Sequence, residues 1–90
     1  MTPELREQLR LALIGILASA GAIGMARPSL KPAIAVAGFR DLPAADLDNE
    51  LDYLAGKGLA ERMSKTLSPE IVRWKITAAG RDYAAEEGLA

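Results

Sequence analysis

The second half of the chain carries the pattern that most restricts its fold. Three leucines recur at helical spacing between Leu47 and Leu54, and a Gly-Lys-Gly stop follows them. Two short segments with strand character, Leu59 to Met63 and Ile71 to Ile76, flank a turn-forming stretch that contains Ser-Pro. Thr77 then stands where the N-cap of a last helix belongs. A helix, a β-hairpin and a further helix in this order predict an α+β domain that is mostly helical.

The first half predicts a long helix from Pro3 to about Ala20. Thr2 is a suitable N-cap, and proline is favoured at the first helical position. The apolar side of this helix is expected to consist of Leu5, Leu9, Leu13, Ile16 and Leu17. Gly21 to Pro28 is expected to be a connection, with a short extended piece at Ala22 to Gly24.

A short second helix is predicted from Ser29 to about Ala37, with Ser29 as its cap. Pro32 would then be the third helical residue, where a missing N–H is tolerated. Phe39 is a candidate core residue. The next helix is expected to begin near Pro43, so the two helices have the spacing of a helix-turn-helix.

Composition narrows the range of functions. The chain has 90 residues, which suits one domain, and 50% of them are hydrophobic. Cysteine and histidine are absent, so the usual metal ligands and the usual general base are missing. We therefore expect no catalytic residues, no metal and no cofactor, so the protein is not expected to be an enzyme. The absence of cysteine also fits a protein of the reducing cytoplasm. The net charge of −1 argues against a strongly basic nucleic-acid coat protein.

The stretch from Leu11 to Ala26 contains no charged residue. It is shorter than the roughly 20 apolar residues of a membrane span, and no basic segment precedes it as in a signal peptide. It is interpreted as a buried helix and a glycine-rich turn, so no membrane partner is expected.

Two segments resemble the winged helix-turn-helix superfamily, particularly the small MarR-, PadR- and ArsR-like bacterial proteins. Leu51 to Arg62 (LDYLAGKGLAER) is similar to the recognition helix, tight turn and first wing strand of that family. Trp74 to Arg81 (WKITAAGR) is similar to its last wing strand and final helix. The resemblance implies three to four helices and a two-stranded β-wing. The chain is also similar to short winged-helix proteins encoded in Mu-like bacteriophages and prophages.

This resemblance implies binding to double-stranded DNA, often as a homodimer, by a transcriptional regulator or a phage accessory factor. In the family the third helix enters the major groove and the wing touches the adjacent backbone. The groove-facing positions carried over to this sequence are Ala44, Ala45, Asp48, Asn49 and Asp52.

The charges divide unevenly between the third helix and the wing. Five acids surround the third helix, and no basic residue lies between Arg40 and Lys57; the acids are Asp41, Asp46, Asp48, Glu50 and Asp52. Acids in the groove would be repelled by the phosphates, so contact is expected mainly through the wing. The candidate DNA-binding residues are Arg62, Lys65, Arg73 and Lys75 for phosphates, with Asn49 as a minor base reader. The wing cations would form a compact basic patch if they shared the outer face, although they could also be ordinary solvated strand charges.

The alternative is a protein–protein interaction module without DNA binding. The third helix would then face a basic protein partner through Asp46, Asp48 and Asp52. A homodimer that uses the first and last helices is expected under the first hypothesis, because the apolar side of the first helix is expected to exceed what one small core can cover.

Overall fold

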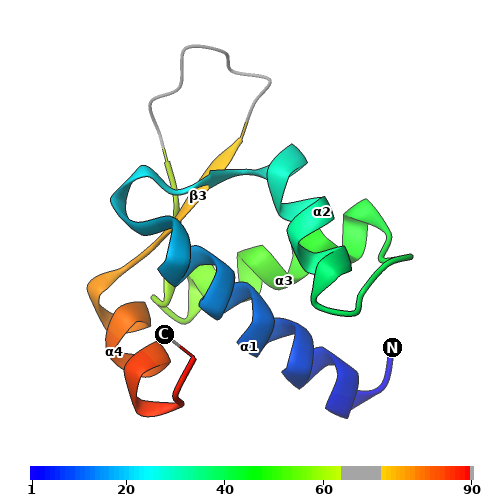
Figure 1. The fold of residues 1–90 in the computed structure, drawn as a ribbon, viewed down its shortest axis with the longest axis horizontal. Helices are drawn as coiled ribbons and strands as arrows, with labels where there is room; N and C mark the ends of the chain where they lie inside the picture. The colour runs from blue at the N-terminus through cyan, green and yellow to red at the C-terminus, as the bar shows by residue number, and fades with distance from the viewer. Residues whose placement is uncertain (64–71, 90) are drawn as a thin grey trace.

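The computed structural model describes residues 1–63 and 72–89, which form four α-helices and a three-stranded antiparallel sheet (Figure 1). The expected α+β class, mostly helical, is confirmed. The elements are α1 (Pro3–Ala20), the 3₁₀ helix η1 (Gly21–Ile23), β1 (Met25–Ala26), α2 (Arg27–Val36), α3 (Ala44–Gly56), β2 (Ala60–Arg62), β3 (Arg73–Ile76) and α4 (Ala78–Glu86). The predicted hairpin tip, Ser64 to Glu70, lies outside the described residues.

Helix α1 has the predicted bounds, and its N-cap is confirmed. The backbone N–H of Leu5 donates a hydrogen bond to Thr2 Oγ1 at 3.2 Å. The apolar side of α1 differs from the prediction at its N-terminal end, because Leu5 is 45% exposed, whereas Leu9, Leu13 and Leu17 are fully buried. Figure 1 shows α1 crossing the molecule, with α4 near one end and α2 near the other. Within the described ranges, no helix is both long enough and apolar enough to cross a membrane.

The connection after α1 contains a strand that the sequence pattern did not predict there. The expected extended piece at Ala22 to Gly24 is wrong, because η1 occupies most of it and β1 follows. Met25 pairs with Trp74 in an antiparallel ladder. Gly24 makes this approach possible: its φ is +71°, and a Cβ there would lie 2.4 Å from the carbonyl oxygen of Trp74. A distant strand, rather than local propensity, therefore places β1.

Helix α2 begins two residues earlier than predicted. Its N-cap is Ala26, which offers no side-chain hydrogen bond, so the predicted Ser29 cap is wrong. Pro28 occupies the first turn, where backbone N–H groups have no intrahelical partner. Pro32 consequently lies inside the helix, beyond the first turn in which it was expected. Phe39 is half-buried and packs against the core from its edge.

Helix α3 and the hairpin follow the prediction closely. The N-cap is Pro43, and Gly58 has the positive φ of +76° expected just after a helix end. The two strands are shorter than predicted, and β3 lies between β1 and β2 in the sheet. Cross-strand partners are Ala60 with Ile76, Glu61 with Lys75, and Arg62 with Trp74.

Helix α4 has the predicted Thr77 cap, which accepts a hydrogen bond from the N–H of Gly80 at 3.0 Å. Within α4, Gly80 and Ala84 are buried, whereas Ala78 and Ala79 are exposed. Gly80 is buried because the backbone carbonyl of Leu59 lies against it.

One apolar core joins all the helices to the sheet. Its buried members come from α1, α2, α3, α4 and the strands, and they are Leu9, Leu13, Ile14, Leu17, Leu30, Ile34, Leu42, Leu47, Leu51, Leu54, Ala60, Trp74, Ile76 and Ala84. Trp74 is only 5% exposed and thus forms part of this core. The sheet and helices therefore present the outer side of α3 and the outer sheet face to solvent.

Candidate nucleic-acid interface

The predicted wing cations do not share one face of the sheet. Directly opposed residues of an antiparallel pair project to the same side. Lys75 opposes Glu61 on the outer face, and Arg73 lies on that face too. Arg62 opposes the buried Trp74, so it lies on the other side, toward α3. Arg62 therefore does not share the outer face with Arg73 and Lys75, so the condition for one patch of these three cations is not met, and Lys65 lies outside the described residues.

The two outer-face cations already have partners. Lys75 Nζ lies 3.0 Å from Glu61 Oε1. Arg73 Nη2 donates to the backbone carbonyls of Ile23 at 3.1 Å and Gly24 at 3.4 Å. These contacts tie β3 to β2 and to η1. They give both cations a structural role and reduce their availability to a phosphate.

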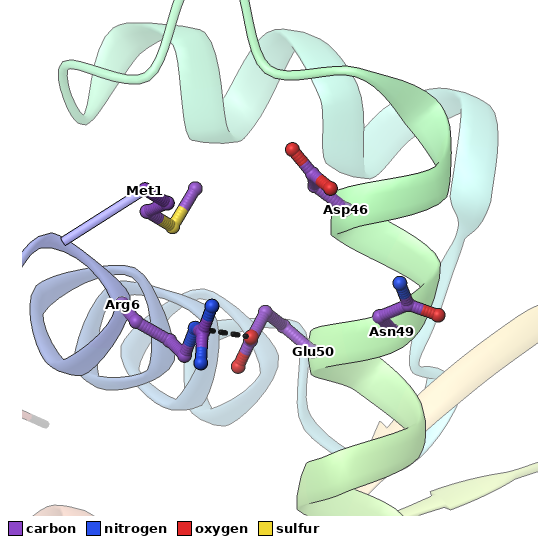
Figure 2. A pocket seen from close by; sticks show the side chains of 5 residues that line it. All are labelled: Met1, Arg6, Asp46, Asn49 and Glu50. Carbon is purple, nitrogen blue, oxygen red and sulfur yellow. Dashed lines mark ion pairs between the residues drawn. The ribbon is translucent and has the colours of Figure 1, made fainter. Parts of the chain in front are cut away.

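The exposed side of α3 consists of the positions expected to face a groove. Ala44, Ala45, Asn49 and Asp52 are exposed, and Asp48 is half-exposed, while the leucine stripe faces inward. Figure 2 shows Asn49 beside Asp46 on α3, facing a hollow of about 260 Å³ that Arg6 and Glu50 also line. The side of α3 that was expected to face a groove is therefore exposed, and Asn49 supplies the amide side chain on it.

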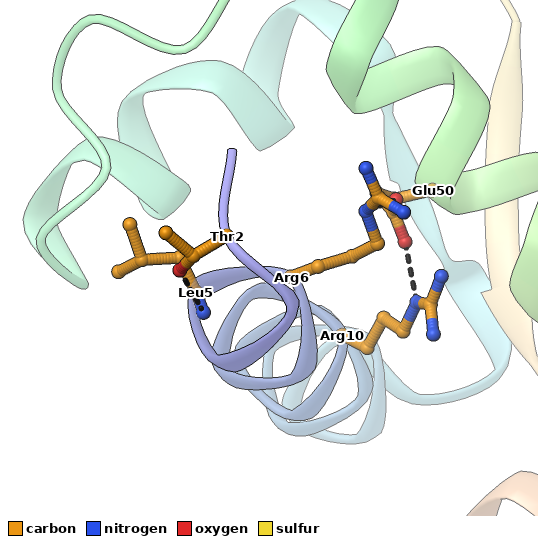
Figure 3. Close-up of polar contacts among 5 residues, drawn as sticks. All are labelled: Thr2, Leu5, Arg6, Arg10 and Glu50. Atoms are coloured by element: carbon orange, nitrogen blue, oxygen red, sulfur yellow. Dashed lines mark hydrogen bonds and ion pairs between the residues drawn. The ribbon is translucent and has the colours of Figure 1, made fainter.

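Glu50 is the acid that the sequence pattern misassigned. Glu50 is only 7% exposed, and two arginine side chains of α1 form ion pairs with its carboxylate (Figure 3). Arg10 Nε donates to Glu50 Oε2 at 2.5 Å, and Arg6 Nε lies 3.5 Å from Glu50 Oε1. The hydrogen bond with Glu50 is the main reason that the pKa of Arg10 is raised, although burial opposes the rise. The Arg10 guanidinium also lies 3.6 Å from the centre of the Tyr53 ring.

A signal for this burial was present in the sequence. The positions of Leu47, Glu50, Leu51 and Leu54 follow the i, i+3, i+4, i+7 spacing of one buried helix side. A carboxylate inside such a stripe is expected to be paired.

A second ion pair neutralises Asp48. Arg27, the first residue of α2, places Nη1 2.9 Å from Asp48 Oδ2. The pair lines a hollow of about 330 Å³ between α2, α3 and the hairpin, together with Asp52, Arg62 and Trp74. Two arginines and two aspartates therefore surround one depression beside the exposed side of α3.

The acids proposed for a protein partner consequently differ from one another. Asp48 is paired, whereas Asp46 and Asp52 form no ion pair with any residue in the described ranges. Three arginines from α1 and α2 offset two of the acids of α3.

Comparison with models of protein families and with curated proteins finds no match to this chain.

Proposed function

We propose that the protein is a winged helix-turn-helix domain that binds double-stranded DNA. The element order α1–β1–α2–α3–β2–β3–α4 and the strand order β1–β3–β2 support this assignment, since they provide two consecutive helices followed by a hairpin. The exposed side of α3 would face the duplex, and the hairpin would lie beside it.

The observation that carries the proposal is the partial neutralisation of α3, in which two of its four acids are paired with arginine. A helix with unpaired acids would be repelled by phosphates, but Glu50 and Asp48 are each paired with arginine. Arg62 lies beside the same side of α3 and forms no ion pair with the residues that the structure describes. It is therefore the favoured phosphate contact, and Asn49 is the favoured base contact through its amide.

The test is fluorescence anisotropy with a labelled random duplex, at low and then at physiological salt. We expect micromolar binding at low salt that weakens steeply as salt rises. Arg62→Ala should weaken binding several-fold and reduce the slope of log K against log salt by about 0.9, the value for one lost phosphate contact. Lys75→Ala, in the same hairpin but paired on the outer face, is the matched control and should change binding little. Absence of binding at low salt would refute the proposal.

The second candidate is the interaction module that binds a basic protein partner. Asp46 and Asp52 on α3, which form no ion pair within residues 1–63 and 72–89, favour it. Asp52→Lys separates the two functions while leaving the Arg27–Asp48 pair in place. It should strengthen DNA binding under the first proposal and abolish partner binding under the second.

A further inference from the structure

A small hollow lies beside α2, where the helix leads into the link to α3. Its volume is about 240 Å³, and the residues that line it come from the second half of α2 and from the link. Its apolar lining includes the half-buried Phe39 and two residues at the border of the core, Ile34 and Leu42. Figure 1 shows α2 and this link at the end of the molecule opposite α4. The hollow therefore gives a partner access to apolar surface beside the core.

The charged residues that line this hollow are all basic. Lys31 and Arg40 are exposed, and neither forms an ion pair with another residue in the ranges 1–63 and 72–89. The sequence has no aspartate or glutamate between Gln8 and Arg40, so α2 supplies no acid of its own. Asp41 follows Arg40 but lines the adjoining hollow beside α1. The charges of this hollow have one sign, and they favour an acidic partner.

The size of the hollow indicates that the partner inserts a single side chain. A dry cavity of about 150 Å³ is large enough for benzene, so the hollow beside α2 has room for one side chain as large as that of phenylalanine or leucine. Sites for drug-sized molecules have about 300 to 1,000 Å³ and enclose most of the ligand. DNA phosphates would contact the two cations but leave the apolar lining unused. A large apolar side chain with carboxylates next to it would use both parts of the hollow.

We propose that this hollow docks an acidic segment of another protein through one large apolar side chain. That side chain packs against Phe39, and aspartates or glutamates on either side of it pair with Lys31 and Arg40. Val36 lies one helical turn after the lining residue Pro32 and is 91% exposed, so it extends the apolar contact along α2. The surface and its charge differ from those of the acids of α3. The inference therefore depends neither on DNA binding nor on the second candidate function.

The first test is selection from a display library of random short peptides on the wild-type protein at low salt. We expect the enriched peptides to share one large apolar residue with aspartate or glutamate on both sides. A labelled peptide of this kind should bind in fluorescence anisotropy and lose affinity about tenfold when its apolar residue becomes serine. Its binding should also weaken as the salt concentration rises. A selection that enriches no peptides with this pattern would overturn the proposal.

Charge reversal in the hollow locates the binding surface. Lys31→Glu and Arg40→Glu should each weaken binding of the enriched peptide about fivefold or more, because a like charge then faces the carboxylates. Both residues are exposed, so the variants are expected to fold, which urea unfolding checks. Arg81→Glu on α4 is the matched control, because Arg81 is exposed and lies outside the hollow, and its affinity should equal that of the wild type. Equal affinity of all four proteins would overturn the proposal.

The same four proteins are then titrated with the labelled random duplex. Lys31→Glu and Arg40→Glu are expected to change duplex binding no more than Arg81→Glu does. If they weaken duplex binding and leave peptide binding intact, the two cations contact phosphates and the proposal is wrong. If the wild type binds the peptide but not the duplex, the docking site stands and only the DNA-binding proposal fails.

Discussion

Replacing Gly80 by alanine is expected to destabilise the protein by about 3 kcal/mol, although alanine is the best helix former. Gly80 lies in the first turn of α4, where its N–H donates to Thr77 Oγ1. A Cβ at this position would lie 2.0 Å from the carbonyl oxygen of Leu59 and 2.6 Å from Ile76 Cγ1. The backbone carbonyl cannot move alone, because Leu59 leads into β2. The helix would therefore have to move away from the hairpin.

Gly15→Ala is the control for this prediction. Gly15 is also helical, but a Cβ there meets only ordinary contacts, the nearest at 3.5 Å from the carbonyl oxygen of Leu89. Alanine should stabilise the protein by about 0.5 to 1 kcal/mol through helix propensity. Urea unfolding followed by far-UV circular dichroism measures both changes. Equal stability of the two variants would contradict the packing of α4 against the hairpin.

Replacing Arg10 by methionine is expected to destabilise the protein by about 2 to 3 kcal/mol. Methionine retains the apolar stem and the helix propensity of the arginine, so the change isolates the guanidinium. The loss arises because the Glu50 carboxylate, with a side chain only 10% exposed, loses its 2.5 Å hydrogen bond. The stacking of Arg10 on Tyr53 is lost as well.

Arg6→Met serves as the matched control for this ion pair. Arg6 contacts the same carboxylate at 3.5 Å, but its side chain is 49% exposed, so its loss should remain below about 1 kcal/mol. Adding Glu50→Leu to Arg10→Met should recover part of the lost stability, because no unpaired carboxylate remains buried. Urea unfolding of the single and double variants measures this coupling. Additive losses would show that the carboxylate and guanidinium do not act together.

The sequence predicted the elements more accurately than it predicted the faces of the site. Pro3–Ala20 was predicted with its true bounds because the cap, the leading proline and the glycine stop are all local signals. The Thr77 cap and the Gly58 turn were predicted for the same reason. The strand at Met25 was missed because its pairing partners in β3, Trp74 and Arg73, are far away in the chain.

The faces on which the charged side chains lie show the same difference between local signals and distant partners. Strand geometry alone puts Arg73 and Lys75 on the face opposite to the buried Trp74 and Ile76. The side on which Arg62 lies depends on the register with β3, which a short strand with mixed residues does not specify.

What the sequence by itself determined is the order of helices and strands, because caps, stops and periodicity act over a few residues. What only the tertiary structure decided is which charges remain free. Glu50 and Asp48 belong to an acidic helix in the sequence, yet residues 40 and 21 positions away neutralise them. The electrostatic character of α3 therefore depends on helices packed against it, and a count of charges along the helix cannot include the arginines that α1 and α2 contribute.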